Sequence, residues 1–288
     1  MDDASASEIK ALVRLLDDPD GQVQETVQSR LDTLGRDALP TLRQMRDEVA
    51  DETTRDRIDE VVHRIHLGDV EQAWNTILTQ DEVNLERGAF VLALYRFPQL
   101  DIGAYQQQLD TFAQKIRPDI RALEGPERAL RLAEFMTDEL GFEGNRERYY
   151  DPNNSYLNRV MDRRLGIPIS LSVLYVLLGQ RLDMPVCGVN MPAHYLVKYA
   201  DRQHELFLDV FNGGDPIAKE DCVRFLLKAG IRPLPFYFQC AEPKDTLLRM
   251  VRNLLAIAED SHQEQTAAEL TRLIAPHDPN VDLDEANQ

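Results

Sequence analysis

Residues 166–185, GIPISLSVLYVLLGQRLDMP, decide the fold that we expect for this chain. From Ile169 to Leu178, apolar side chains cover nearly every side of a helical wheel, and a helix that is hydrophobic all round has to be buried in a larger core. A run of about ten apolar residues is also too short to cross a bilayer, which takes about 20. The sequence therefore predicts a buried helix inside a water-soluble core.

Two strand-like segments follow this helix, HYLVKY at 194–199 and ELFLDVF at 205–211. A hairpin centred on Asp201 and Arg202 would place residue 197 opposite residue 206 and His194 opposite Asp209, on one face of the sheet. A carboxylate that orients an imidazole is two thirds of a nucleophilic triad. We therefore expect the functional site at this pair.

The charge of the chain restricts its partners. Lys and Arg number 32 against 50 Asp and Glu, which gives a net charge of −18. Binding to nucleic acid or to an anionic membrane needs clustered positive charge. We therefore expect neither a nucleic-acid nor a membrane partner.

The cysteines and the N-terminus indicate the compartment. Cys187, Cys222 and Cys240 are the only three cysteines and have no CxxC spacing, so an odd and sparse set argues against a disulfide framework. The acidic N-terminus lacks the pattern of a signal peptide. The expectation is a cytoplasmic protein, and no motif indicates a cofactor.

Helical periodicity divides the rest of the chain into segments. Residues 1–67 form paired amphipathic helices whose pattern resembles a HEAT-type repeat. In residues 1–60, 8 basic and 16 acidic side chains leave a net charge of −8. The remaining segments are a helical layer at 68–145, with helices that stop near Pro118 and begin at Pro126, the core at 146–240, a helical hairpin at 241–277 and an acidic, disordered tail at 278–288.

One spacing within the first segment is typical of metal sites. Glu60, His63 and His66 lie one turn apart on one helical face, which is the Glu-x-x-His spacing of di-iron bundles. Those bundles need a second copy and further carboxylates on facing helices, and the sequence has none. An amphipathic helix with incidental histidines is the favoured interpretation.

A polar and aromatic turn precedes the buried helix. Residues 144–154, GNRERYYDPNN, concentrate the residue types of a structured turn, and Asn154 or Ser155 would cap a helix that runs to Arg164. Such a turn can form a binding surface or be a loop held by side-chain-to-backbone hydrogen bonds, and both interpretations stay open. The candidate binding residues are Tyr150, Asn154, Tyr156, Asn158, Arg164, Asn212 and Gly213.

Residues 81–260 resemble the SirB-type transglutaminase-like proteins of bacteria. The resemblance rests on YYDPNNSYLNRVMDRRLGIPISLSVLY at 149–175, MPAHYLVKY at 191–199 and LFLDVFNGG at 206–214. It implies a mostly helical α+β fold with a papain-like core, in which a helix that begins with a catalytic Cys packs on a small antiparallel sheet that carries His and Asp. It also implies that the C-terminal hairpin is tetratricopeptide-like.

The resemblance matches His194 to the family's histidine and Asp209 to its aspartate, but it leaves no cysteine. The Gly-x-Cys of active relatives corresponds to Gly166, Ile167 and Pro168, so Pro168 stands at the nucleophile position. Ser170, in the first turn, is one substitute, and its alternative is a hydroxyl bonded to the backbone. Cys187 is a weaker substitute, since a buried cysteine on a strand is normally an inert small hydrophobe.

Two functions therefore compete. The favoured one is a noncatalytic binding or regulatory module with a protein or peptide partner. The alternative is a hydrolase or acyltransferase on amide or ester bonds, with His194 as base, Asp209 as its orienter and Ser170 as nucleophile. A metal site at His194 and Asp209 lacks further ligands. A Ser170 hydroxyl without solvent access would count strongly against the enzyme.

Overall fold

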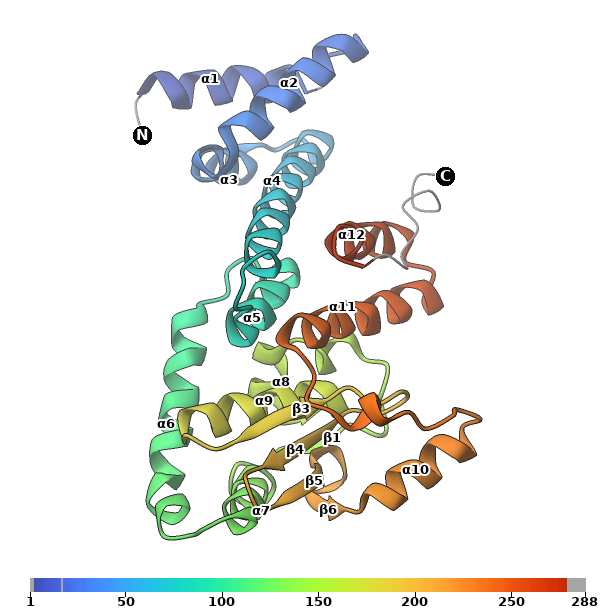
Figure 1. The fold of residues 1–288 in the computed structure, drawn as a ribbon. Coiled ribbons are helices and arrows are strands. Elements are labelled where there is room, and N and C mark those ends of the chain that lie inside the picture. The colour runs from blue at the N-terminus through green and yellow to red at the C-terminus, as the bar shows by residue number, and fades with distance from the viewer. Residues whose placement is uncertain (1–2, 17, 279–288) are drawn as a thin grey trace. The chain divides into compact units, whose positions relative to one another are not determined.

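The computed structural model describes residues 3–16 and 18–278 of the chain. Its contacts divide the chain into two compact units, Met1–Thr76 and Ile77–Gln288. Helices dominate and two small sheets complete the fold (Figure 1), which confirms the expected mostly helical α+β class. In the described part of the chain, no helix combines the length and the apolar character needed to cross a membrane.

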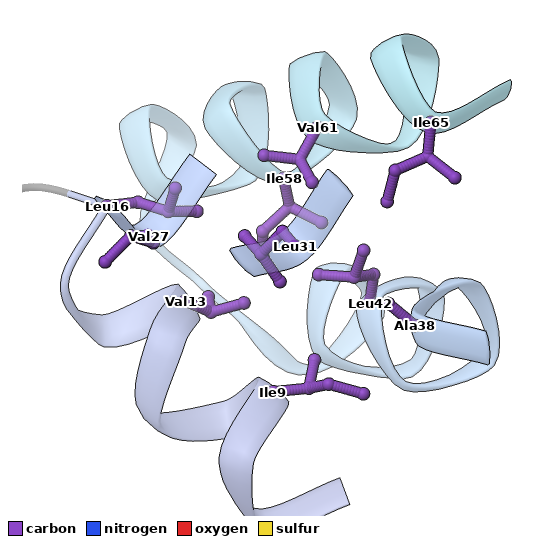
Figure 2. Packing of buried hydrophobic residues seen from close by; sticks show 10 residues of the cluster. All are labelled: Ile9, Val13, Leu16, Val27, Leu31, Ala38, Leu42, Ile58, Val61 and Ile65. Carbon is purple, nitrogen blue, oxygen red and sulfur yellow. The ribbon is translucent and has the colours of Figure 1, made fainter. Parts of the chain in front are cut away.

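The N-terminal unit consists of short helices that bury one apolar cluster. They are α1 (Asp3–Arg14), α2 (Gly21–Leu34), the 3-10 turn η1 (Gly35–Ala38), α3 (Leu39–Glu48) and α4 (Glu52–Leu78), which continues into the second unit. The Asp20 carboxylate begins α2 by accepting a hydrogen bond from the Gln22 backbone N–H. Figure 2 shows side chains from α1, α2, α3 and α4 meeting around the fully buried Leu31, Leu42 and Ile58.

Helices α5 (Leu85–Arg96), α6 (Ile102–Arg121) and α7 (Pro126–Glu134) open the second unit, and a π-helical turn at Phe135–Glu139 follows α7. The expected helix end near Pro118 is wrong, because Pro118 lies inside α6. A proline in a helix interior removes one backbone hydrogen bond. Continuation of the helix buries Ile120, which is 1% exposed, and this burial offsets the lost bond.

The core of the second unit is a sheet between helices. Helix α9 (Pro168–Arg181) is buried from Pro168 to Gly179, as its sequence predicts. It packs against β3 (Val186–Val189) and β4 (Leu196–Ala200) of an antiparallel sheet with the order β3-β4-β5-β6. The other elements of the core are β5 (Glu205–Asp209), the 3-10 turn η4 (Val210–Asn212), β6 (Asp215–Ile217), α8 (Leu157–Arg163) and the parallel pair β1 (Glu143–Gly144) and β2 (Leu165–Gly166).

The first two C-terminal elements cover the second face of the sheet, and the last two form a helical hairpin. They are α10 (Lys219–Lys228), the 3-10 turn η5 (Pro235–Phe238), α11 (Pro243–Asp260) and α12 (Glu264–Ile274). Leu226 of α10 and Phe238 of η5 pack with Leu196 and Phe207 in one buried cluster. Helices α11 and α12 form the expected helical hairpin (Figure 1).

The strand register differs from the expected one by two residues. Val197 pairs with Leu208, because the loop between β4 and β5 is longer than a two-residue turn. The Asp201 carboxylate accepts hydrogen bonds from two backbone N–H groups within that loop and so stabilises the longer turn. A shift of two residues keeps every side chain on its face of the sheet. The surface that carries His194 and Asp209 is therefore preserved.

Two expected boundaries, the start of α8 and the start of the C-terminal tail, differ in the structure. The N-cap of α8 is Tyr156, not Asn154 or Ser155, because the Asn154 side chain is committed to the preceding turn. The tail does not start at Asp278, which is buried and forms an ion pair with Arg252 of α11. The rest of the expected tail, 279–288, lies outside the described residues.

One disulfide is present, although the number of cysteines argued against a disulfide framework. Cys187 of β3 and Cys240, just before α11, form a disulfide with 5.5 Å between their Cα atoms. The two cysteines are separated by 53 residues in the sequence, so no local spacing could reveal the pair. The Ala241 N–H also donates to the Gly188 carbonyl at 2.8 Å. The disulfide therefore fastens the segment before α11 to the free edge of β3.

Candidate functional site

The structure brings His194 and Asp209 together. His194 lies in the turn before β4 and Asp209 is the last residue of β5. The Nε2 atom of His194 is 2.8 Å from Oδ2 of Asp209, and both side chains are largely buried. The contact fixes the orientation of the imidazole and leaves its Nδ1 atom without a hydrogen bond to the described residues.

The turn that carries His194 is held from outside the sheet. Ala193 has a φ of 61°, a left-handed conformation that is costly for a residue with a Cβ atom. Arg249 of α11 donates to the Met191 carbonyl at 2.7 Å and to the side chain of Asn190. Burial lowers the pKa of Arg249 below its ordinary range. A partly buried guanidinium thus fixes the position of the turn.

Asp209 lies at the centre of a polar network. Its Oδ2 atom also accepts a hydrogen bond from Asn212 Nδ2 at 2.7 Å, and Asn212 Oδ1 accepts one from Arg146 at 2.6 Å. Burial raises the pKa of Asp209, but the hydrogen bond and charge of His194 and the bonds from Asn212 outweigh burial and leave this pKa below its ordinary value. Asp209 is therefore an ionised carboxylate at neutral pH.

Aromatic rings surround the pair. The His194 ring lies edge-on to Phe211 of η4, with 6.5 Å between centroids, and is tilted against Phe225 of α10 at 6.0 Å. Phe211 in turn contacts Tyr149 at 6.0 Å, and Tyr149 contacts Tyr150 at 5.2 Å. The polar network therefore lies beside a partly exposed row of rings.

Ser170 has a structural position in the first turn of α9. It is fully buried. Its Oγ accepts a hydrogen bond from the Ile167 N–H at 3.0 Å and lies 2.6 Å from the Asn154 carbonyl oxygen. These contacts are those of a hydroxyl bonded to the backbone, the alternative that the sequence left open. The Ser170 side chain makes no hydrogen bond to His194 within the described residues.

Neither Cys187 nor Cys222 offers a reactive thiolate. Cys187 is bonded to Cys240, which corrects its interpretation as a free thiol. Cys222 of α10 is free but completely buried. Burial raises the pKa of the Cys222 thiol, and the Asp209 carboxylate raises it further. Pro168, without any nucleophilic atom, is the first residue of α9.

The structure separates the other candidate binding residues into two groups. Asn212 belongs to the polar network, Gly213 follows it with a φ of 99°, and Tyr150 lies at the end of the ring row with 72% of its surface exposed. The remaining candidates serve the turn and the core, and they are Asn154, Tyr156, Asn158 and Arg164.

Asn154 shows why that second group is structural. Its Nδ2 atom donates to the carbonyls of Arg148 and Tyr149, and its Oδ1 accepts from Asn145. Tyr156 and Asn158 are buried. The Arg164 guanidinium stacks over the rings of two phenylalanines. The turn is therefore held by side-chain-to-backbone bonds, and its exposed aromatic edge stays available for binding.

Sequence reasoning missed several residues of the site: Arg146, Tyr149, Phe211 and Phe225. Arg146 and Tyr149 lie in the turn already singled out, so the same composition signal could have included them. Phe211 directly precedes the selected Asn212. Phe225 is an exposed aromatic residue on α10, 41% accessible, and no local pattern connects it with His194.

A cavity of about 340 Å³ adjoins the polar network. Its lining includes Arg146, Phe211, Asn212 and Gly213, together with Thr137, Glu143 and Gly144. Its wall thus shares Asn212 and Phe211 with the surroundings of His194. In the described part of the chain, no group of three or more His, Cys, Asp or Glu side chains is placed to hold a metal ion.

Comparison with known proteins places the chain in a family. Residues 103–252, which include α9, His194 and Asp209, match the transglutaminase-like superfamily. A UPF0162 protein of Xylella fastidiosa is 31% identical over 221 residues, which cover 72% of this chain and 77% of that protein. A UPF0162 protein of Pseudomonas aeruginosa is 30% identical over 193 residues, 65% of this chain and 69% of that protein.

A likeness over a shorter stretch extends to eukaryotes. The F-box only protein 21 of Homo sapiens is 32% identical over 139 residues, which cover 46% of this chain but 22% of that protein. No solved structure matches the chain. The extent of the superfamily match and the coverage of the Xylella relative show that this chain belongs to the transglutaminase-like superfamily.

Proposed function

We propose that this protein is a noncatalytic binding or regulatory module, which uses the surroundings of His194 and Asp209 to hold a protein or peptide partner. The SirB-type assignment, the HEAT-type interpretation of the N-terminal helices and the tetratricopeptide-like interpretation of the C-terminal hairpin stay predictions. The proposal concerns the core alone.

The observation that carries the proposal is the state of the Ser170 hydroxyl. A serine becomes a nucleophile when a base within hydrogen-bond reach takes its proton. Ser170 is instead buried and bonded to Ile167 and Asn154. Its use in catalysis would break these bonds and leave a buried N–H and a buried carbonyl without partners, each of which costs about 1–3 kcal/mol.

The retained His194 and Asp209 are suited to binding. The ionised Asp209 lies 2.8 Å from Nε2 of His194, so Nδ1 is the ring nitrogen without a hydrogen bond to the described residues. A hydrogen-bonding group of a peptide backbone would fit there. Exposed aromatic rings beside this atom supply apolar contact area at a small entropic cost.

The alternative, a hydrolase or acyltransferase with Ser170 as nucleophile, has one supporting observation. The 2.8 Å contact between His194 and Asp209 is the geometry of a base and its orienter. The nucleophile is the part that this alternative lacks.

Labelling and turnover measurements on the full chain test the proposal. We expect no labelling by a fluorophosphonate probe at Ser170, and no hydrolysis of p-nitrophenyl esters or peptide anilides above the level of a His194→Ala variant. Circular dichroism would verify that the variants are folded. Turnover that disappears in both His194→Ala and Ser170→Ala, with both variants folded, would establish the enzyme instead.

A further inference from the structure

Five rings form a continuous aromatic row: Tyr150, Tyr149, Phe211, His194 and Phe225. Neighbouring centroids are 5.2, 6.0, 6.5 and 6.0 Å apart along this order. Four separate segments contribute to the row, namely the turn before α8, η4, the turn before β4 and α10. Tyr149, Tyr150 and Phe225 are among the few large apolar side chains that the described residues expose.

A polar chain accompanies the aromatic row. It runs from His194 to Asp209, Asn212 and Arg146 through contacts of 2.8, 2.7 and 2.6 Å. The Arg146 guanidinium lies 5.7 Å from the centre of the Phe211 ring. Phe211 therefore belongs to the aromatic row at one side and touches the end of the polar chain at the other.

Arginines without an ion pair lie at this end of the site, although Glu143 lines the same cavity. The chain carries a net charge of −18, yet the exposed Arg146 and Arg148 form no ion pair with the described residues, and Arg146 donates a hydrogen bond to Asn212. Asp209, the nearest carboxylate of the network, is already bonded to His194 and Asn212. Arg146 also lines the cavity of about 340 Å³. An exposed cation in a concave site attracts an anionic group.

We propose that the aromatic row and the Arg146 cavity together bind an extended peptide segment in which a proline or aromatic residue stands close to a carboxylate. The inference rests on the proposed function, because it names the partner class of the same site. The apolar residue of the peptide packs on Tyr149 and Tyr150, at the end of the row that adjoins Phe211 and Arg146. The carboxylate enters the cavity beside Arg146.

The contacts proposed for the peptide follow from the groups that the site exposes. A peptide backbone group hydrogen-bonds to the Nδ1 atom of His194, which has no hydrogen-bond partner in the described structure. Proline-rich segments dock on aromatic surfaces because their extended conformation is already formed and loses little entropy. The extended form also lets one segment reach from the aromatic row to Arg146, since Phe211 touches both.

Single-stranded nucleic acid also stacks on rows of rings, but it needs a groove of clustered positive charge that follows its backbone. Two arginines in a chain of net charge −18 do not supply such a groove. A peptide with one carboxylate needs only the single cation at Arg146.

The test is selection from a phage-displayed library of random dodecapeptides against the full-length oxidised protein. We expect enrichment of sequences that place a Pro, Tyr, Phe or Trp within a few residues of Asp or Glu. For a synthetic peptide of the enriched sequence, replacement of its carboxylate by the amide should weaken binding about tenfold, as for a charged hydrogen bond at an exposed site.

Two variants and two controls distinguish the contacts. Arg146→Gln should reduce the tenfold preference for the carboxylate to about one, and Tyr150→Ala should weaken both peptides about five- to tenfold. Arg202→Gln and Phe236→Ser change an exposed arginine and an exposed aromatic residue outside the aromatic row, and they should leave the affinity unchanged. Library selection without enrichment, or a carboxylate preference that survives Arg146→Gln, would overturn the inference.

The outcomes also separate this inference from the proposed function. A peptide that binds as described but is cleaved, with cleavage lost in His194→Ala, would refute the noncatalytic proposal and support the peptide class. Absence of both binding and turnover would refute the peptide class alone.

Discussion

Removal of the disulfide between Cys187 and Cys240 should measurably destabilise the second unit. The crosslink closes a loop with a sequence separation of 53 residues, and loop-closure entropy gives a loss of about 4 kcal/mol in the free energy of unfolding for a loop of this size. The Ala241–Gly188 hydrogen bond and the burial of Phe238 hold the same segment in the folded state. The crosslink therefore acts mainly on the unfolded chain.

The assay compares urea unfolding of the wild-type protein, with and without dithiothreitol, with that of a Cys187→Ser, Cys240→Ser double variant. The double variant in either buffer should match the reduced wild type, because it lacks the crosslink in both. Cys222→Ser serves as a control for loss of a thiol that forms no disulfide. Hydrogen exchange should show the loss at the most protected amides throughout the second unit, because a crosslink that acts on the unfolded chain changes the global free energy of unfolding.

Two results would refute this reasoning. The first is a difference of less than about 1 kcal/mol between the oxidised and reduced proteins, well below the typical range for a native disulfide. The second is a thiol titration of the protein, unfolded without reductant, that finds all three cysteines free.

Three further predictions concern the site and its support. Ser170→Ala should lower the free energy of unfolding by about 1–3 kcal/mol, because it leaves the Ile167 N–H and the Asn154 carbonyl without their partner; urea unfolding measures this, and an unchanged stability would contradict it. Gly214→Ala should lower the free energy of unfolding by about 2 kcal/mol or more, since Gly214 has a φ of 82° and an added Cβ would lie 2.6 Å from the Ala133 Cβ. The added Cβ of the matched Gly21→Ala variant meets open space, so thermal unfolding should show that variant to be as stable as the wild type or slightly more stable. The pKa of Asp209 is lowered in the folded state, so the stabilisation from its carboxylate is fully present above the unfolded pKa of about 3.9 and is lost as the pH falls through the lower folded pKa. The difference in the free energy of unfolding between the wild type and Asp209→Asn should therefore be constant near neutral pH and shrink below about pH 4. A difference independent of pH would contradict this prediction.

Local patterns were sufficient for most of the helices and failed where distant contacts compete with them. Pro126 marks a helix boundary in both the sequence and the structure, since proline geometry acts over a few residues. Pro118 did not end its helix, because burial of Ile120 depends on tertiary packing. The same reason explains why Asn154 bonds to the preceding turn and not to α8.

The site shows the same difference between features set by local patterns and features set by distant contacts. The pairing of His194 with Asp209 could be anticipated because strand periodicity conserves faces even when the register shifts by two residues. The rings of Tyr149 and Phe225 could not, because they reach His194 from segments that share no local pattern with it.

The sequence by itself determined a buried helix within 166–185, an antiparallel hairpin after it and a histidine paired with an aspartate, because hydrophobic periodicity and strand alternation are local properties. Only the tertiary structure decided that Cys187 bonds to Cys240 and that the Ser170 hydroxyl is hydrogen-bonded to the backbone. It also decided that an aromatic row flanks His194 and Asp209. These features depend on which distant segments of the chain meet in the fold. Burial, hydrogen-bond partners and pKa values therefore follow from the tertiary structure.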